Sequence, residues 1–370
     1  MQRLALKHFL LTERLLIKFH QTMLLSFAHM DHMTSLSQNH INQHLFISIK
    51  TITLQMLKIK FLNKDLNLSN IKLNFLLLSI FFFSIYSLAD TKLIILGSGT
   101  PNPDPDRYGS GYAVVVNQSA YIIDFGPGIV RRISAMSPPW GGKFPSMELK
   151  NIDIAFLTHI HSDHSGALSD LILTPWIMGR SKPLNLYGPK GLKDMSKNII
   201  EAYREDINYR LYGSQPANKY GYTTNVTEIN EDGIIYKDEN VEVLAFKNDH
   251  GDFENSYGFL FTTDDKKILF SGDTAVSKNL MRYGNDLDIL VHEVYSSETF
   301  VNKTKDWQIY HQAHHTSSID VGYIANKLKP KKLVLSHILF WGATNESILK
   351  DVNVNFRGDV VIAEDLMIIE

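Results

Sequence analysis

Thr158-His159-Ile160-His161-Ser162-Asp163-His164 places three imidazoles and a carboxylate within six residues. The stretch directly follows the apolar segment 152–157, whose composition is typical of a buried strand. In a loop, His159 and His161 can point to one side and converge on one cation, while Asp163 and His164 turn toward a second. Histidine is uncommon and here is regularly spaced, so the pattern predicts a metal site rather than a solvated polar loop.

Three further candidate ligands each follow an expected strand. His250 comes after segment 241–246, Asp273 after 267–270, and His337 after 333–335. Singly, each could be a capping or core residue. Together with the first cluster they supply five histidines and two aspartates, enough for two adjacent zinc ions with a bridging hydroxide. The chain has no cysteine, which excludes disulfides, thiolate ligands and a cysteine nucleophile, so a metal site must be built from histidine and carboxylate.

Residues 90–370 alternate short apolar runs with turn residues and helical stretches, without a linker-like segment or a repeat. Further strands are expected at 92–96, 112–116, 121–125, 184–187, 257–261, 287–291, 332–335 and 360–362. Helices are expected at 129–136, 166–177, 191–205 and 317–328. This interleaving predicts a single α/β domain.

The first 89 residues differ from the rest in charge and in pattern. They hold 9 of the 37 basic and 3 of the 39 acidic residues, which leaves 28 against 36, a balance of −8, for residues 90–370. Segment 73–89 follows Lys72, is apolar and ends in small residues, the order of zones in a secretory signal peptide. Its apolar core is shorter than the ~20 residues that a membrane span needs.

We therefore expect residues 56–89 to be a signal peptide that is cleaved before Asp90, and the protein to be exported to the periplasm or the exterior. Residues 1–55 would precede the true start at Met56, as a start-site artefact. A retained N-terminal anchor is the alternative. The six histidines of this region are discounted as ligands.

Shorter motifs make residues 92–370 resemble the metallo-β-lactamase superfamily, in particular its ribonuclease Z and arylsulfatase-like branch. Besides the histidine-rich loop, these are Leu-Gly-Ser-Gly-Thr (96–100), Ile-Asp-Phe-Gly-Pro-Gly (123–128), Tyr-Gly-Pro-Lys-Gly (187–191), His250-Gly, Phe-Ser-Gly-Asp-Thr (270–274), Val-His-Glu (291–293), His315-Thr-Ser-Ser and Leu-Ser-His (335–337). The resemblance implies a four-layer αββα sandwich with a dinuclear site at one edge of its sheets.

The resemblance also implies a role for each candidate ligand. One zinc ion would be held by His159, His161 and His250, the other by Asp163, His164 and His337, with Asp273 bridging the two. Other divalent metals stay open. Asp124 would lie behind the metal loop and orient it through hydrogen bonds, although a turn-capping role fits its sequence equally well.

Catalysis would need a further group near the leaving atom. His315 stands at the position of a functional histidine in the ribonuclease Z motif, with His311 and His314 as close rivals. Glu293 could orient that histidine or bind water beside the metals. Asp163 would serve in catalysis as well as in metal binding.

Three observations argue against tRNA, the substrate of ribonuclease Z. Those enzymes carry a long arm between their fourth histidine ligand and the bridging aspartate, but only 22 residues separate His250 from Asp273. Residues 90–370 are acidic, whereas nucleic-acid binding draws most of its affinity from lysine and arginine. An export signal would also separate the protein from tRNA precursors.

The sequence thus favours hydrolysis of a small sulfate or phosphate ester, with ribonuclease Z activity or a lactonase as alternatives. Trp307, Tyr310 and Trp341 could line an apolar pocket for an aryl group, whereas Trp176 is better explained by core packing. A di-iron redox protein would need a flavin domain, which is missing, and a non-catalytic member would have lost ligands. A nucleic-acid partner is not expected, and a homodimer is left open.

Overall fold

The alternation of side chains along β1 (Thr91–Gly97) explains why the chain forms stacked layers. In the computed structural model, which describes residues 90–370, Leu93 and Ile95 face one apolar cluster while Ile94 and Leu96 face another. A strand that is apolar on both faces is stable only when both faces are covered. The expected leader and its cleavage site lie outside the described residues.

Two seven-stranded sheets pack against each other through the cluster that holds Leu93 and Ile95. The first has the order β14-β1-β2-β3-β4-β5-β6, with β2 (Gly111–Val116), β3 (Ser119–Ile123), β4 (Ile154–Phe156), β5 (Leu184–Gly188), β6 (Thr224–Glu228) and β14 (Ile368–Ile369). The second has the order β13-β12-β11-β10-β9-β8-β7, with β7 (Gly233–Lys237), β8 (Glu242–Lys247), β9 (Tyr257–Thr262), β10 (Lys267–Phe270), β11 (Ile289–Tyr295), β12 (Lys332–Leu339) and β13 (Asp359–Ile362). Each sheet has an antiparallel half and a parallel half. The parallel half of the first sheet runs from β3 to β6, and that of the second runs from β10 to β13.

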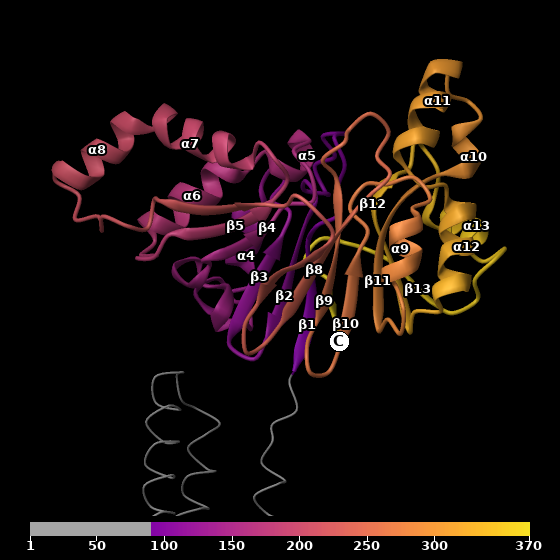
Figure 1. The fold of residues 1–370 in the computed structure, drawn as a ribbon, viewed down its shortest axis with the longest axis horizontal. Helices are drawn as coiled ribbons and strands as arrows, with labels where there is room; N and C mark the ends of the chain where they lie inside the picture. The colour runs from indigo at the N-terminus through magenta and orange to yellow at the C-terminus, as the bar shows by residue number, and fades with distance from the viewer. Residues whose placement is uncertain (1–89) are drawn as a thin grey trace, which may run out of the picture. The chain divides into compact units, whose positions relative to one another are not determined.

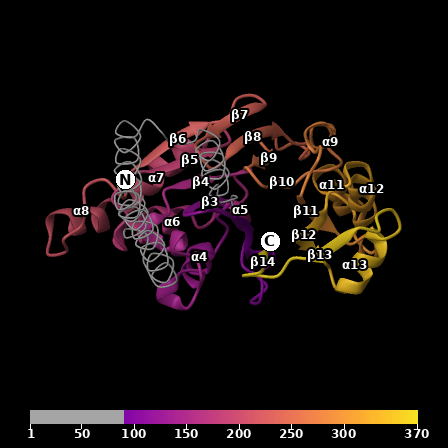
Figure 2. The same cartoon turned by 90° about the horizontal axis from the view of Figure 1, so that it is seen from below.

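Helices cover the outer face of each sheet, as both views show (Figures 1 and 2). The first sheet is covered by α4 (Ile129–Ala135), α6 (Leu168–Ile177) and α7 (Leu192–Ala202), and the second by α9 (Lys278–Tyr283), α12 (Ser318–Leu328) and α13 (Asn345–Val352). The predicted four-layer αββα sandwich is confirmed. None of the helices between residues 90 and 370 has the length and apolar character to cross a membrane.

Two expected strand ends are wrong. His337 and Glu293 were both expected just past a strand, but His337 lies inside β12 and Glu293 inside β11. The pairing of these strands shifts register between His292 and Val294, and His337 itself has a left-handed backbone with φ of 46°. A bulge of this kind re-aims side chains without ending the strand, so both residues project toward the site from within paired backbone.

Several short elements were not expected from the sequence. Among the helices these are α5 (Ser162–Ser165), α8 (Arg204–Tyr212), α9, α10 (Ser297–Phe300), α11 (Lys305–His314) and α13, and among the strands β6, β7 and β14. Helix α11 matters most, because it carries aromatic and histidine side chains to the edge where the candidate ligands meet. Thr304 before its first turn, with Asp306 within that turn, is the sequence pattern that could have revealed it.

Asp238 ties the two sheets together at the turn between β7 and β8. Its carboxylate accepts hydrogen bonds from the hydroxyls of Tyr121 (2.6 Å) and Tyr236 (2.8 Å), and from the backbone of Asn240 and Val241. Burial alone would raise the pKa of Asp238, but these hydrogen bonds hold it below its ordinary value. The carboxylate therefore stabilises the fold above its unfolded-state pKa, and this contribution is lost as the pH falls through the lower folded-state value.

We expect Asp238→Asn to lower the free energy of unfolding at pH 7 by about 1 kcal/mol, a value reduced from that of a fully buried charged hydrogen bond because Asp238 is partly exposed. The loss should shrink toward pH 3, where the wild-type carboxylate is being protonated. Urea unfolding at both pH values measures it. Asp264→Asn, which changes an exposed carboxylate in the β9–β10 turn, is the control. An equal loss at both pH values would contradict the role of the charge.

Candidate metal centre

The histidine-rich loop that follows β4 is held in place by two other segments, one just before β2 and one just after β3. The amide of Phe125 donates to the carbonyl of His164 (2.7 Å), and the amide of Ser110 donates to that of Asp163 (2.9 Å). A Cβ atom on Gly126 would lie only 2.0 Å from the carbonyl oxygen of Asp163. Glycine is therefore required there, because any side chain would push the loop away from its support.

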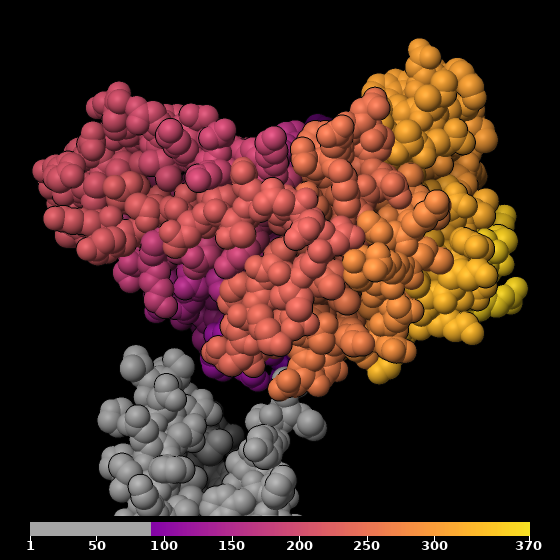
Figure 3. All heavy atoms as spheres, viewed as in Figure 1, coloured from indigo at the N-terminus to yellow at the C-terminus, as the bar shows by residue number. Residues whose placement is uncertain are grey.

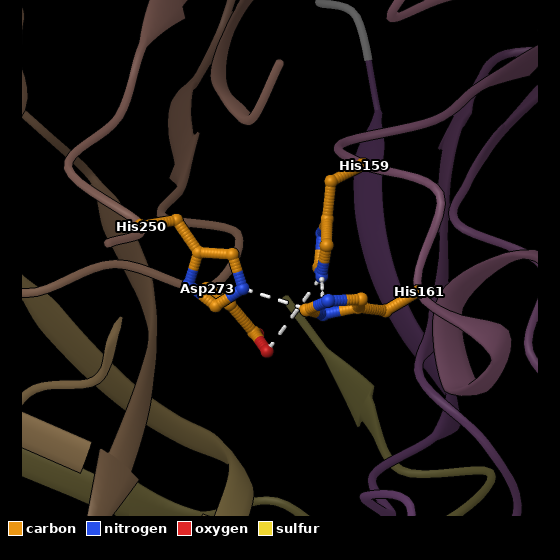
Figure 4. A group of neighbouring side chains, drawn as sticks. All are labelled: His159, His161, His250 and Asp273. Carbon is orange, nitrogen blue, oxygen red and sulfur yellow. Dashed lines mark hydrogen bonds and ion pairs between the residues drawn. The ribbon is translucent and has the colours of Figure 1, made fainter. Parts of the chain in front are cut away.

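Four side chains from three separate segments form a first group of candidate ligands. His159, His161, His250 and Asp273 point toward one another (Figure 4), with one ligand atom from each lying within 4.8 Å of the others. His161 Nδ1 is 3.0 Å from His159 Nε2 and 3.3 Å from His250 Nε2. Tetrahedral zinc with bonds of ~2.0–2.1 Å places its ligand atoms roughly 3.4 Å apart, so the spacing suits one ion.

The second group shares Asp273 with the first and adds three fully buried side chains. Asp163, His164 and His337 complete it, again within 4.8 Å. His337 Nε2 lies 3.0 Å from Asp163 Oδ2, and His164 Nε2 lies 3.4 Å from Asp273 Oδ1. His164 Nε2 and Asp273 Oδ1 are buried without a hydrogen-bond partner. Such orphaned polar atoms are rare, and a cation between the two groups would satisfy both. The structure thus brings together all seven candidate ligands.

The far sides of the imidazoles are fixed by hydrogen bonds that orient them. His164 Nδ1 lies 2.8 Å from Asp124 Oδ2, and His250 Nδ1 donates to the carbonyl of His314 (2.8 Å). Asp124 also accepts from the amide and hydroxyl of Thr158, at 2.8 Å and 2.9 Å. A proton held on Nδ1 leaves the lone pair of Nε2 facing the site, as metal binding requires. Asp124 therefore lies behind the loop, in the position that the family resemblance implies.

In the first group the protonation states are those of a metal site, whereas in the second group the carboxylates, Asp273 foremost, outweigh burial and raise the pKa of His164 and of His337. Burial lowers the pKa of His159 well below its ordinary value, and lowers that of His250 to about 4. Both imidazoles are therefore neutral at pH 7. Burial would raise the pKa of Asp273, but His337 and His164 hold it well below its usual range. Neutral imidazoles and an ionised carboxylate are the forms that bind divalent metals.

The three histidines left open by the sequence have different surroundings. His315 Nδ1 lies 3.9 Å from Asp273 Oδ2 and 3.5 Å from Glu293 Oε2, so His315 stands beside the ligands. The ring of His314 stacks on Tyr310 with centroids 4.1 Å apart. His311 is 8% exposed and lies farther out, against Trp307 and Trp341.

A cleft of about 350 Å³ opens above the ligands. Trp307, Tyr310 and Trp341 line it together with Asp163 and Asp273, as the sequence predicted for the three aromatic residues. Trp176 is buried in the core and packs on Tyr222. Lys303 also lines the cleft and was not foreseen. Figure 3 shows the molecule hollowed along its upper edge, between the segment of α7 and α8 and that of α11.

A comparison with protein families places this site in a known group. The family model described as Anti-Pycsar protein Apyc1 matches residues 91–308, more than half of the 370-residue chain. The chain belongs to this family. The Apyc1 match begins at β1 and ends within α11, so it includes all the candidate ligands except His337.

Curated and solved relatives agree with the observed fold. Ribonuclease Z of Mycobacterium bovis is 27% identical over 259 residues, which cover 66% of this chain and 85% of the relative. The metallo-β-lactamase fold protein YhfI of Bacillus subtilis has a TM-score of 0.58 at 18% identity, covering 76% of this chain and 99% of YhfI. The short form of human tRNase Z, ELAC1, has a TM-score of 0.57 at 21% identity, covering 75% and 98%. The metallo-β-lactamase fold and the ribonuclease Z branch, both predicted from the motifs, are confirmed.

Proposed function

We propose that this Apyc1-family protein hydrolyses a small phosphate ester with two divalent metal ions, zinc above all. The observation that carries the proposal is that Asp273 belongs to both groups of ligand atoms. A carboxylate shared by two sites would bridge two ions, and a donor set of histidine and carboxylate suits zinc. Two such ions would lower the pKa of a shared water and neutralise charge on the phosphoryl oxygens.

Side chains beside the candidate ligands would donate a proton to the leaving group. Burial lowers the pKa of His315 to about 4, so its imidazole is neutral at pH 7. Burial, and then the charge of Asp273, raises the pKa of Glu293 well above its ordinary value. As negative charge grows on a leaving oxygen, the imidazole can donate one proton to it while Nδ1 accepts another from Glu293 Oε2, 3.5 Å away.

A small phosphodiester fits the cleft better than tRNA does. Strands β9 and β10 pair as an antiparallel hairpin across the segment between His250 and Asp273, so no arm protrudes from this part of the described chain. The aromatic lining suits a flat ring beside the scissile group. The relatives named ribonuclease Z and tRNase Z support a phosphodiester over a sulfate ester, and they keep tRNA processing as the second candidate.

We expect the zinc-loaded protein to hydrolyse bis(p-nitrophenyl) phosphate and to cleave precursor tRNA poorly. Residues 90–370 carry more acidic than basic side chains, and the segment between His250 and Asp273 forms no tRNA-binding arm. Release of p-nitrophenol and gel analysis of tRNA ends measure the two activities. The corresponding aryl sulfate and a lactone complete the panel. Lower salt should not rescue tRNA cleavage, since geometry as well as charge disfavours it. Site-specific tRNA cleavage at a comparable or higher kcat/KM would overturn the assignment in favour of ribonuclease Z.

A further inference from the structure

We propose that Lys303 and His311, backed by Trp341, form an anion-binding subsite at the outer end of the cleft, which holds a second negatively charged group of the substrate. The inference rests on the proposed function for the scissile group and narrows its substrate class. The substrate would be a phosphate ester that carries an aromatic ring and a further anionic substituent, such as a carboxylate or a second phosphate. The first anionic centre would lie at the metal ligands.

Lys303 stands in the same cleft as the ligands but belongs to a different part of the fold. It lies between α10 and α11, and it lines the cleft together with Asp163 and Asp273. Its Nζ lies 4.2 Å from the ring centre of Trp341, which follows β12. The two residues come from separate loops, so their contact fixes the ammonium group at one place on the cleft wall.

The ammonium group of Lys303 has no anionic partner within the described residues. Other lysines form ion pairs, as Lys331 does with Asp288 at 2.6 Å, but none of the ion pairs among residues 90–370 includes Lys303. Burial lowers the pKa of Lys303, which reflects the cost of removing its charge from water. An anion bound beside it would offset that cost.

His311 is a second polar side chain that lines the cleft. Its side chain is 8% exposed, and its Nδ1 is buried with no hydrogen bond. The ring is held in place by stacking on Trp307, with centroids 5.5 Å apart, and by contact with Trp341 at 4.5 Å. Because Nδ1 is enclosed by protein, the nitrogen that could donate an N–H to an anion in the cleft is Nε2, which forms no hydrogen bond with the described residues. The aromatic faces around it would pack against the ring of the substrate.

A purely structural cation–π contact is the competing explanation, and the protein provides one for comparison. Lys327 lies over the ring of Tyr323, 5.5 Å from its centre, on helix α12. Lys327 does not line the cleft. The substitutions Lys303→Met and Lys327→Met therefore remove the same charge from the same kind of contact, and only the first should affect ligand binding.

The test compares phenylphosphonate with its 3-carboxy and 4-carboxy derivatives on the zinc-loaded full chain, by calorimetry and by tryptophan fluorescence. We expect one carboxylated ligand to bind the wild type about tenfold more tightly than phenylphosphonate, as one added charge-assisted contact allows. Lys303→Met should reduce this advantage below about twofold, while Lys303→Arg and Lys327→Met should keep it. His311→Phe, which keeps the stacking and removes the N–H, should reduce it in part. Phenylphosphonate itself should bind all variants alike.

The proposal is overturned if neither carboxylated ligand binds more tightly to the wild type, or if Lys303→Met preserves the advantage. It is also overturned if Lys303→Met weakens all three ligands equally, because that would indicate general damage to the cleft. These experiments measure ligand binding and need no catalysis. Failure of the protein to hydrolyse any phosphate ester would therefore contradict the proposed function without contradicting the anion-binding subsite.

Discussion

Asp273→Ala is expected to lose most of the bound metal and at least about a thousandfold in kcat/KM, equivalent to roughly 4 kcal/mol of transition-state stabilisation. The physical reason is that one carboxylate contributes to both ligand groups. Asp273 Oδ2 lies 3.9 Å from His159 Nε2 and 3.5 Å from His337 Nε2. Removing it would take a ligand from both ions and remove the strongest, though not the only, negative charge that balances His164 and His337.

Metal content per chain, measured by plasma mass spectrometry after dialysis, tests this together with ester hydrolysis. Asp252→Ala changes an exposed carboxylate two residues from His250 and should keep both metal and activity. Circular dichroism would establish that the Asp273 variant is folded. A folded Asp273→Ala protein with two tightly bound zinc ions would show that the carboxylate does not bridge.

The candidate ligands could be predicted from the sequence because most of them lie close together in the chain or directly after a recognisable strand. Four of the seven candidate ligands come from the loop and short helix that follow β4, and His250 and Asp273 each follow a strand whose apolar pattern is plain. The sandwich was accessible for the same reason, since strands such as β1 are apolar on both faces. Both the alternation of apolar residues and the spacing of histidines can be recognised within a short stretch of sequence.

What the sequence did not predict depends on contacts between distant segments. The strand position of His337 follows from the bulged pairing of β11 with β12, which no local pattern encodes. Helix α11 was missed because Trp307 and Ile309 are exposed, so it lacks the clear apolar stripe of a surface helix. Its link to the metal site is a hydrogen bond from His250 to the carbonyl of His314, 64 residues away.

His315→Ala is expected to keep both metal ions and to lower kcat by about 10²–10⁴-fold for an ester with a poor leaving group, the usual range for loss of a general acid. His315 forms a third cluster of potential ligand atoms with Glu293 and His337, but it belongs to neither group that shares Asp273, and its Nδ1 lies 3.9 Å from Asp273 Oδ2, so its removal should not release the two ions. The loss should be far smaller for p-nitrophenyl esters, because p-nitrophenolate departs without a proton. A comparison of phenyl with p-nitrophenyl methyl phosphate therefore isolates the role of the proton.

Glu293→Gln tests the same proton transfer as His315→Ala. Glu293 Oε1 accepts hydrogen bonds from the amides of Thr316 (2.9 Å) and Thr274 (3.3 Å), which leaves Oε2 facing the imidazole. Glu293→Gln keeps that shape but cannot pass a proton in the same way, so it should reproduce the leaving-group dependence of His315→Ala in weaker form. His314→Ala removes a ring that stacks on Tyr310 and packs edge-on against His250, but it keeps the backbone carbonyl that holds His250, so it should retain most of the rate. If His315→Ala slows both esters equally, or loses a metal ion, the imidazole acts on the metal centre rather than on the leaving group.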